Sequence, residues 1–366
     1  METQVSDNPN QIKVAVFSDF YEPAYRAGGP IVSVSRIANS EINASVRVIT
    51  RDRDARCKTP HRNARIREWV AVERADVAYL RPGTIDWPWL IRQIRDWQPD
   101  LIYVNSIHSK AFALFPMMLR CLGVLSSSIL LVAPRGETAP GAQSLKAMKK
   151  RAARPLIKSL LRNQVTTWHF STKLEHTETI AWWGSHFPAE HKVVIAPNPA
   201  PQPAKTAATP EAHERFRLLF ASRIDRKKGL DDLLRALAGV TESLELIVYG
   251  AISDKQYWSE CQNLMTQLPS NVRVRLGGDY RPTDMFNLTS RADLFVLPTR
   301  GENFGHAIAE ALSVGCPVLI YDTTPWSFID KRGGFVVADV AGLRAAISDF
   351  LGLSRTERIR VRSAAL

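Results

Sequence analysis

The sequence contains little cysteine and no apolar run of the length that a membrane span requires. Its 366 residues include four cysteines, which are widely separated and form no C-x-x-C pair, so a structural zinc or a redox centre is not indicated. No apolar run approaches the ~20 residues of a membrane-spanning helix. The polar start, residues 1–11, lacks the hydrophobic segment of a signal peptide. We therefore expect a cytoplasmic protein with reduced thiols.

A dinucleotide fingerprint is also missing. The predicted first strand, 13–18, leads through a loop to Gly28 and Gly29 and then to a predicted helix, 31–40, but the turn has no G-x-G-x-x-G pattern. A glycine turn between a strand and a helix still lets a substrate approach the backbone at the carboxyl edge of a parallel sheet. By itself this is a weak indication of a binding site.

A short D-x-D pattern occurs at Asp52 and Asp54, where carboxylates of this spacing could hold a divalent metal. Three arginines, at positions 51, 53 and 56, surround the two acids and would neutralise them. We interpret the segment as a charged loop and expect no metal.

The net charge of +12 is concentrated in the first half of the sequence. Residues 1–200 carry 27 Lys and Arg against 17 Asp and Glu, whereas residues 201–366 carry 21 against 19. Within 101–162, ten residues are basic and one, Glu137, is acidic. This concentration points to an anionic partner of the first half.

A predicted helix at 143–162 carries seven of these basic residues together with apolar residues at helical spacing. Two interpretations stay open: the helix packs on the core with a solvated basic face, or that face contacts anionic lipid headgroups or a polyprenyl-diphosphate-linked acceptor. Near an anionic bilayer each basic residue would contribute on the order of 1 kcal/mol. Aromatic residues are not interleaved with the basic run, so we expect no nucleic-acid partner.

Short apolar runs alternate with helical patterns along the chain. Strands are predicted at 13–18, 46–50, 77–80, 101–104, 129–133, 167–170 and 193–196, and again at 218–222, 244–249, 272–276, 294–297, 317–321 and 334–337. Helices are predicted at 31–40, 87–97, 109–122, 143–162, 173–184, 230–240, 255–268, 283–290 and 340–351. This alternation predicts parallel sheets with helices on both faces.

A stretch rich in Pro, Ala and Thr near 197–210 separates the two series and reads as a linker. We predict an α/β protein of two doubly wound, Rossmann-like domains, 1–197 and 215–366, joined by a linker at 198–214. The ligand is expected in the cleft that faces the carboxyl edges of both sheets.

The stretch T-R-G-E-N-F-G-H-A-I-A-E-A-L at 299–312 follows the predicted strand 294–297 and opens a helix near Gly305. Unpaired N–H groups of Phe304, Gly305 and His306 at a helix start favour phosphate oxygens. Gly305 has no side chain and lets a ligand approach the backbone.

Two carboxylates flank this helix start. Glu302 and Glu310, with seven residues between them, can accept hydrogen bonds from neighbouring hydroxyl groups. A ligand with an anionic diphosphate and vicinal hydroxyls is a nucleotide sugar. For the two glutamates taken alone, an ordinary capped helix with a solvated Glu302 is the simpler interpretation; the surrounding strands and the N-F-G sequence favour the ligand site.

A second group of charges, S-R-I-D-R-K-K-G, lies between the predicted strand 218–222 and the helix that follows. Arg223 and Lys228 can both point toward a diphosphate at the carboxyl end of the strand. Two fixed cations there could stabilise the charge on a departing nucleotide diphosphate without a metal. A solvated basic turn is the alternative.

These motifs together resemble the family 4 retaining glycosyltransferases of the GT-B fold, also called glycosyl transferases group 1. The resemblance rests on Arg223-x4-Lys228, on Glu302-x7-Glu310 and on the G-C-P-V-L-I that follows. It extends over nearly the whole chain, because the turn at Gly28-Gly29, which we assign to donor binding, and the P-N-P at 197–199 also fit.

The resemblance implies roles for individual residues. Arg223 and Lys228 would bind the diphosphate, and Glu310 would bind the ribose. Glu302, with the amides from Asn303 onward, would hold hydroxyls of the donor sugar. The family also implies retention at the anomeric carbon by front-face displacement, in which the leaving phosphate oxygen helps to take the acceptor's proton, with no metal or other cofactor.

The acceptor side is less defined. Many relatives carry a histidine after the fourth strand, where this sequence has Asn105, so His108 is either a substitute or a plain loop histidine. Arg135 and Glu137 follow the predicted strand 129–133 and would bind acceptor or donor phosphate, or pair with each other. We assign all four residues to the acceptor pocket.

Relatives of this family also continue into a helix that returns to the first domain, whereas this sequence ends at Leu366. Two interpretations stay open: a C-terminal truncation, or a short closing element.

We therefore predict a retaining enzyme that moves a sugar from a nucleotide-sugar donor to a glycan or lipid-linked glycan acceptor. The expected setting is bacterial surface polysaccharide synthesis (lipopolysaccharide O-antigen or exopolysaccharide), in the cytoplasm or on the inner face of the plasma membrane. Two alternatives remain. One is a nucleotide-sugar epimerase of the same fold, and the other is a noncatalytic sugar-nucleotide or membrane-binding protein.

Overall fold

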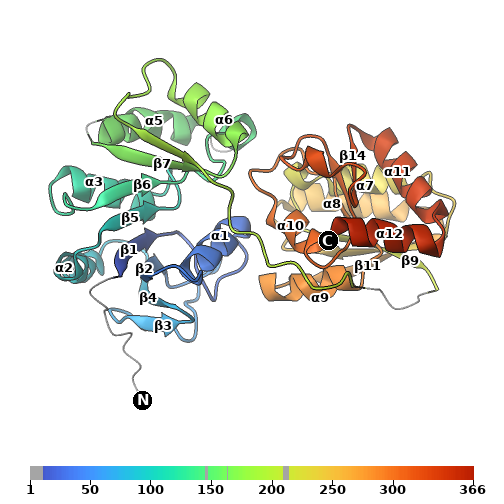
Figure 1. The fold of residues 1–366 in the computed structure, drawn as a ribbon, viewed down its shortest axis with the longest axis horizontal. Helices are drawn as coiled ribbons and strands as arrows, with labels where there is room; N and C mark the ends of the chain where they lie inside the picture. The colour runs from blue at the N-terminus through green and yellow to red at the C-terminus, as the bar shows by residue number, and fades with distance from the viewer. Residues whose placement is uncertain (1–10, 145–146, 163, 209–213) are drawn as a thin grey trace. The chain divides into compact units, whose positions relative to one another are not determined.

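The computed structural model describes residues 11–144, 147–162, 164–208 and 214–366, and the chain divides into two compact units between Pro199 and Ala200 (Figure 1). Each unit is an α/β domain built on its own sheet. None of the helices that these residues form combines the length and the apolar character needed to cross a bilayer.

The sheet of the first unit has eight strands in the order β3-β4-β2-β1-β5-β6-β7-β8. They are β1 (Ile12–Phe17), β2 (Ala44–Arg51), β3 (Val70–Val72), β4 (Ala75–Leu80), β5 (Leu101–Val104), β6 (Ile129–Val132), β7 (Thr166–Phe170) and β8 (Lys192–Ile195). Strand β3 pairs antiparallel with β4, and the other described pairs are parallel. The sequence prediction missed β3, because three half-buried residues are too short to show a period.

Strand β1 shows why this sheet is covered on both faces. Val14 and Val16 are buried in one apolar cluster with Val34 of helix α1 (Gly29–Ala38), whereas Phe17 is buried in a second cluster with Leu90 of α2 (Trp87–Trp97). Successive side chains of a strand point to opposite faces, and here both sets are apolar. The prediction of a doubly wound domain is confirmed.

The sheet of the second unit has six strands in the order β11-β10-β9-β12-β13-β14, and its described pairs are all parallel. They are β9 (Phe216–Ala221), β10 (Leu244–Tyr249), β11 (Val272–Gly278), β12 (Leu294–Leu297), β13 (Val318–Tyr321) and β14 (Gly334–Val337). This is the strand order of a dinucleotide-type fold, in which the winding direction reverses between the first and the fourth strand. Here the reversal lies between β9 and β12, so the loops after these strands diverge and leave room for a ligand.

Helix α2 has the predicted bounds. Five other helices lie close to their predicted positions: α6 (Lys173–Trp183), α7 (Leu230–Leu237), α8 (Lys255–Thr266), α10 (His306–Leu312) and α11 (Val340–Gly352). Side-chain caps explain several starts: Thr172, Asp254 and Asp339 accept hydrogen bonds from N–H groups in the first turns of α6, α8 and α11.

Other helical predictions were wrong in detail. The range 109–122 is a π-helix (Lys110–Leu114) followed by α3 (Phe115–Cys121), and 283–290 is a 3-10 turn (Pro282–Asp284) followed by α9 (Met285–Ser290). The range 143–162 contains the end of α4 (Pro140–Ser144) and then α5 (Ala147–Arg162), while 145–146 lie outside the described residues. The sequence prediction missed α12 (Arg355–Ala365), which a capping box between Ser354 and Glu357 begins.

The loop between β4 and α2 is held by a buried carboxylate. Asp86 accepts hydrogen bonds from the backbone N–H of Arg81 at 3.0 Å, from the Arg81 guanidinium at 2.6 and 3.0 Å, and from Nε of Arg67 at 3.2 Å. The Arg81 side chain lowers the pKa of Asp86; burial opposes this effect, but the Arg81 N–H and Arg67 add to it, so the pKa is about 2.

Asp86 should therefore stabilise the first unit in a pH-dependent way. Its pKa is lower in the folded chain than the ~3.9 of an unfolded chain, so the stabilisation, about 2 kcal/mol, is complete above pH ~4 and is lost as the pH falls toward 2. We expect Asp86→Asn to lower the free energy of unfolding by about that amount at pH 7, and by about half of it at pH 3. Urea unfolding followed by tryptophan fluorescence measures the difference. Asp96→Asn, an exposed position on the same helix, is the control; equal effects of the two variants would contradict the assignment.

Candidate active site

The second-unit candidates lie on two loops at the switch point of its sheet. Arg223 and Lys228 follow β9, and Glu302 and Gly305 follow β12. In an open parallel sheet the carboxyl ends of the strands on either side of the switch point form the binding crevice. The strand order therefore brings together two sequence motifs that are more than 70 residues apart.

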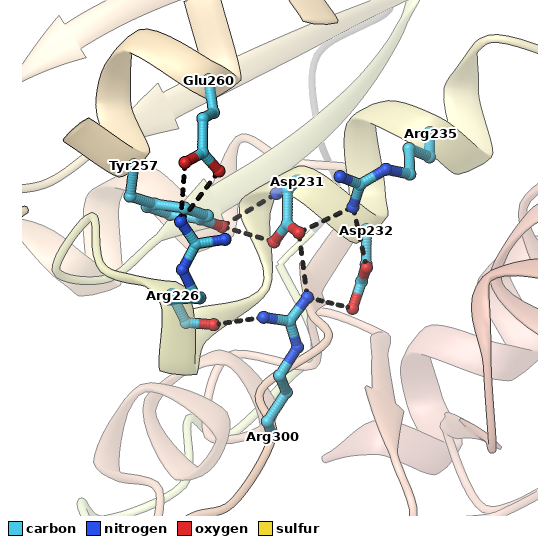
Figure 2. A network of polar contacts seen from close by, with 7 residues as sticks. All are labelled: Arg226, Asp231, Asp232, Arg235, Tyr257, Glu260 and Arg300. Atoms are coloured by element: carbon cyan, nitrogen blue, oxygen red, sulfur yellow. Dashed lines mark hydrogen bonds and ion pairs between the residues drawn. The ribbon is translucent and has the colours of Figure 1, made fainter.

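Arg300 fastens the two loops to each other (Figure 2). Its Nη2 atom donates to Asp231 and to Asp232, at 2.9 Å each, and both acids lie in the first turn of α7. Its Nη1 atom donates to the backbone carbonyl of Arg226 at 2.9 Å. One side chain from the β12 loop thus holds the middle of the β9–α7 turn and the first turn of α7.

The acids that receive Arg300 are themselves fixed. Arg235 donates to Asp231 at 2.7 Å and to Asp232 at 3.3 Å, and the Tyr257 hydroxyl donates to Asp231 at 2.6 Å (Figure 2). Burial raises the pKa of Asp231, but the hydrogen bonds from Tyr257, Arg235 and Arg300 outweigh burial and lower it below its ordinary value. The carboxylate therefore stays charged, as the junction requires.

Backbone contacts bring the loops closer still. The backbone N–H of Arg300 and the hydroxyl of Thr299 donate to the carbonyl of Lys227 at 2.7 and 3.1 Å. Gly229 has a φ of +73°, and a Cβ atom there would lie 2.0 Å from the carbonyl oxygen of Pro298. Because this approach excludes any side chain, the glycine after Lys228 is required by packing.

Glu302 and Lys228 form an ion pair across the two loops, and their side chains are each 12 % exposed. Burial raises the pKa of Glu302, but the charge of Lys228, followed by those of Lys227 and Arg223, outweighs burial and lowers it below the ordinary value. The sequence prediction assigned these two residues to separate parts of the donor. The structure joins them into one charged pair.

The start of α10 is shaped by a left-handed glycine. Gly305, with φ +85° and ψ 58°, precedes His306, the first residue of the helix. The ring of Phe304 packs against His306, with centroids 4.8 Å apart, and against Trp326 at 5.7 Å, and Nε1 of Trp326 donates to the carbonyl of Phe304. The loop is thus held by a tryptophan from the segment after β13, a residue that the sequence prediction missed.

Glu310 is buried on α10, with 5 % of its surface exposed. It lies near Tyr280: burial, and then the charge of Glu310, raise the pKa of Tyr280, while Arg223 opposes them. Tyr280 therefore joins Arg223 and Glu310 at the switch point. Tyr280, Arg300 and Trp326 all come within a few residues of a strand's carboxyl end, and that position is the sequence signal that could have identified them.

In the first unit, the glycine turn at Gly28 and Gly29 begins α1, and Gly28 has a φ of +73° with open space where a Cβ would lie.

The acids of the D-x-D pattern are bound by the protein. Asp54 accepts hydrogen bonds from the N–H groups of Tyr25 and Arg26 at 3.0 and 3.3 Å. The other acid of the D-x-D pattern, Asp52, pairs with Arg53 at 2.7 Å. The segment is a charged loop whose carboxylates have protein partners. Within the described ranges, no group of three His, Cys, Asp or Glu is placed to hold a metal.

Arg135 is engaged by the protein itself. Its guanidinium donates to Asn105 at 2.7 Å, and also to Asn198 and to the hydroxyl of Tyr103. Asn105 is 4 % exposed. Arg135 and Asn105 therefore anchor the segment through which the chain leaves the first unit, and Arg135 does not pair with Glu137.

Glu137 instead gathers the loop after β5. It accepts hydrogen bonds from Ser106 at 3.0 Å, from the N–H of Ile107 at 2.9 Å, and from Nδ1 of His108 at 3.1 Å. Burial raises the pKa of Glu137, but His108, followed by the Ile107 N–H and Ser106, outweighs burial and lowers it. The Nε2 atom of His108 is buried without a hydrogen-bond partner in the described structure, and the ring packs edge-on against Trp182 with centroids 6.0 Å apart.

The basic helix α5 presents apolar residues to solvent. Met148 is 86 % exposed and Leu156 is 53 % exposed, and Lys149 and Arg151 beside them are exposed as well.

A cavity of about 500 Å³ also occurs in this unit, lined by residues such as Arg92, Pro99 and Ser128. Pro99 and Ser128 precede β5 and β6, so this cavity lies at the edge of the sheet opposite the loops that carry the candidate residues.

Comparison with known families matches residues 201–354 to the glycosyl transferases group 1. Among curated proteins, the chain is 29 % identical over 151 residues to a phosphatidyl-myo-inositol mannosyltransferase of Mycobacterium leprae, covering 40 % of this chain and 39 % of that protein. It is 27 % identical over 193 residues to a D-inositol 3-phosphate glycosyltransferase of Xylanimonas cellulosilytica, covering 49 % and 42 %. The matches thus span about two fifths of the length of these relatives.

Solved structures resemble the fold over nearly the whole chain. The sucrose-phosphate synthase of Thermosynechococcus elongatus superposes with a TM-score of 0.71 at 16 % identity, over 97 % of this chain and 92 % of that one. The HepE protein of Anabaena, in a complex with UDP and glucose, superposes with a TM-score of 0.72 at 17 % identity, over 97 % and 94 %. At such identities the likeness establishes the fold.

The fold predicted from the motifs is therefore confirmed: the chain has the GT-B fold. Residues 201–354 match the glycosyl transferases group 1, as the motifs predicted.

Proposed function

We propose that this chain transfers a sugar, with retention, from a nucleotide-sugar donor to a glycan or lipid-linked glycan acceptor. The observation that carries the proposal is the group formed by Arg223, Lys228 and Glu302 at the switch point of a group 1 domain. The R-x4-K and E-x7-E spacings support the family 4 assignment and, with it, retention.

The charges suit the departure of a nucleotide diphosphate. When the bond between the anomeric carbon and the phosphate oxygen breaks, the electron pair stays on the oxygen and the leaving group becomes more negative. Arg223 and Lys228 are fixed cations at that edge of the sheet, and preorganised charge stabilises the transition state more than the ground state. Because the chain supplies this charge itself, we propose a reaction without a metal.

The Lys228–Glu302 pair gives the carboxylate two tasks. Its Oε1 atom pairs with the Lys228 ammonium and holds that ammonium in place. Its Oε2 atom can accept hydrogen bonds from hydroxyls of the donor sugar. Glu310, buried beside Tyr280, suits the neighbouring ribose hydroxyls.

The acceptor is assigned to the first unit. Glu137 lies 3.1 Å from Nδ1 of His108 and fixes the orientation of that ring in the loop after β5. The exposed basic and apolar residues of α5 suit a lipid-linked acceptor at an anionic bilayer, as in bacterial surface polysaccharide assembly on the cytoplasmic side.

Nucleotide binding tests the donor site directly. In calorimetric titrations with UDP, GDP, ADP and CMP, one base is expected to bind and to stabilise the fold, by about 2.7 kcal/mol at a hundred times its Kd. UDP is the first choice, because HepE is solved with it. Lys228→Met should lower the affinity for the nucleoside diphosphate by about tenfold or more. Lys255→Met, at an exposed position that begins α8, should leave this affinity unchanged. If none of the four nucleotides bound, the assignment of a donor site would be contradicted.

Glu302→Gln separates the chemistry from nucleotide binding. We expect transfer to fall by about a hundredfold, while the Kd of the diphosphate stays equal or decreases, because a negative charge beside the phosphates is removed. Acceptor-dependent release of nucleoside diphosphate measures transfer. Unchanged transfer would contradict the catalytic role of Glu302. If the donor sugar were epimerised in the absence of an acceptor, the alternative function of a nucleotide-sugar epimerase would be favoured.

The membrane contact has its own test. We expect the protein to sediment with vesicles that contain anionic lipid at low salt, and not with neutral vesicles. The double substitution Lys149→Glu and Arg151→Glu should reduce binding by about 2 kcal/mol or more. The double substitution Lys255→Glu and Arg355→Glu changes the net charge equally but lies in the second unit, and it should leave binding unchanged. Equal losses in the two variants, or no binding at all, would exclude α5 as the contact.

A further inference from the structure

The turn between β9 and α7 carries four cations, and three of them have acidic partners. Arg226 pairs with Glu260 at 2.8 Å, Arg223 lies 3.8 Å from Asp225, and Lys228 pairs with Glu302. Lys227 makes no ion pair and its ammonium makes no hydrogen bond among the residues that the structure describes. Among the four cations of this turn, Lys227 is therefore the one without an acidic partner in the described part of the chain.

The backbone of Lys227 is fixed in the site. Its carbonyl accepts hydrogen bonds from the N–H of Arg300 and from the hydroxyl of Thr299, at 2.7 and 3.1 Å. Its side chain runs over Gly301, because a Cβ atom built on that glycine would lie 3.6 Å from Cε of Lys227. The end of the side chain therefore lies beside the segment that leads into Glu302, where it is partly desolvated although the residue as a whole is exposed.

The electrostatic surroundings agree with this placement. Burial lowers the pKa of Lys227, and the like charges of Lys228 and Arg223 lower it further, against the opposing effect of Glu302. The same residues therefore surround both the Lys227 ammonium and the Glu302 carboxylate. An anion placed here would relieve the repulsion among the cations.

The local charges do not balance. Arg223, Lys227 and Lys228 are positive, whereas Asp225 and Glu302 are negative. Lys228 is held by Glu302 and Arg223 lies near Asp225, so Lys227 is the cation of this group that has no acidic partner among the described residues. A ligand that brings negative charge to this crevice could pair with that ammonium.

We propose that Lys227 is a third cation for the leaving diphosphate, and that it neutralises the charge that the paired Arg223 and Lys228 leave uncompensated. This inference rests on the proposed function. In the transfer step the bond from the anomeric carbon to the phosphate oxygen breaks, and its electron pair stays on that oxygen. The anomeric carbon bonds to the acceptor oxygen, whose proton passes to the phosphate. Between the two events the diphosphate carries one additional negative charge, and Lys227 faces it.

Ligands of different charge separate this role from a structural one. Calorimetry measures the affinity for the nucleoside diphosphate that wild type binds and for the matching nucleoside. Lys227→Met should lower the affinity for the diphosphate about tenfold or more. The same variant should change nucleoside binding less than twofold. Lys227→Arg should restore most of the affinity, because it returns the charge. Lys255→Met, the exposed lysine that begins α8, is the matched control and should change neither ligand.

Turnover gives a second readout. The negative charge grows as the bond breaks, so Lys227→Met should lower kcat at saturating donor by a larger factor than it raises the Kd of the donor. Equal affinities of wild type and Lys227→Met for the diphosphate would overturn the inference and leave the proposed function intact. Equal losses for nucleoside and diphosphate, without rescue by arginine, would also overturn it. The failure of wild type to bind any nucleoside diphosphate would instead remove the proposed function, and the inference with it.

Discussion

The junction between the loop after β12 and the turn after β9 is the constraint on which the candidate site depends. Arg300 spans it with hydrogen bonds to two acids of α7 and to a backbone carbonyl. The contact of Gly229 with Pro298 leaves no room for a side chain between the two segments. Each hydrogen bond to a charged group contributes roughly 1.5–3 kcal/mol when it is buried and well aligned. Several such bonds within one turn hold the two loops together. In the proposed reaction this matters, because donors must be in place before the bond breaks.

This junction also explains how so many charges of one sign can lie together. The turn from Arg223 to Lys228 would repel itself if its cations were unpaired, and acids from other elements prevent this. Glu260 comes from α8 and Glu302 from the β12 loop. The carboxylates of Asp231 and Glu302 both have lowered pKa values although burial opposes the lowering, so they remain charged near neutral pH. The site is therefore an array of nearly balanced charges.

The first unit is organised differently. Its loops are tied to one another and to the segment that leaves the unit: Arg135 holds Asn198, and Glu137 collects the loop from Ser106 to His108. The polar side chains named here are thus held by other groups of the first unit. In the proposed function, the diphosphate of the donor meets the cations of the second unit, and the acceptor is assigned to the first unit.

The sequence by itself predicted most strands and many helices of both units, and it named the candidate residues of the second unit. Strands such as β5, β10 and β12, and helix α2, were predicted with their observed bounds, because buried apolar runs and a helical period are local properties of the chain. Arg223, Lys228 and Glu302 were named as candidates because each follows a strand, and Glu310 because it stands at a motif spacing from Glu302 inside the next helix. What the tertiary structure alone decided is which charges meet. The pairing of Lys228 with Glu302, the engagement of Arg135 by Asn198 rather than by Glu137, and the unpaired state of Lys227 among the described residues all depend on strand order. Strand order joins loops that are far apart in the sequence, and no local period encodes it.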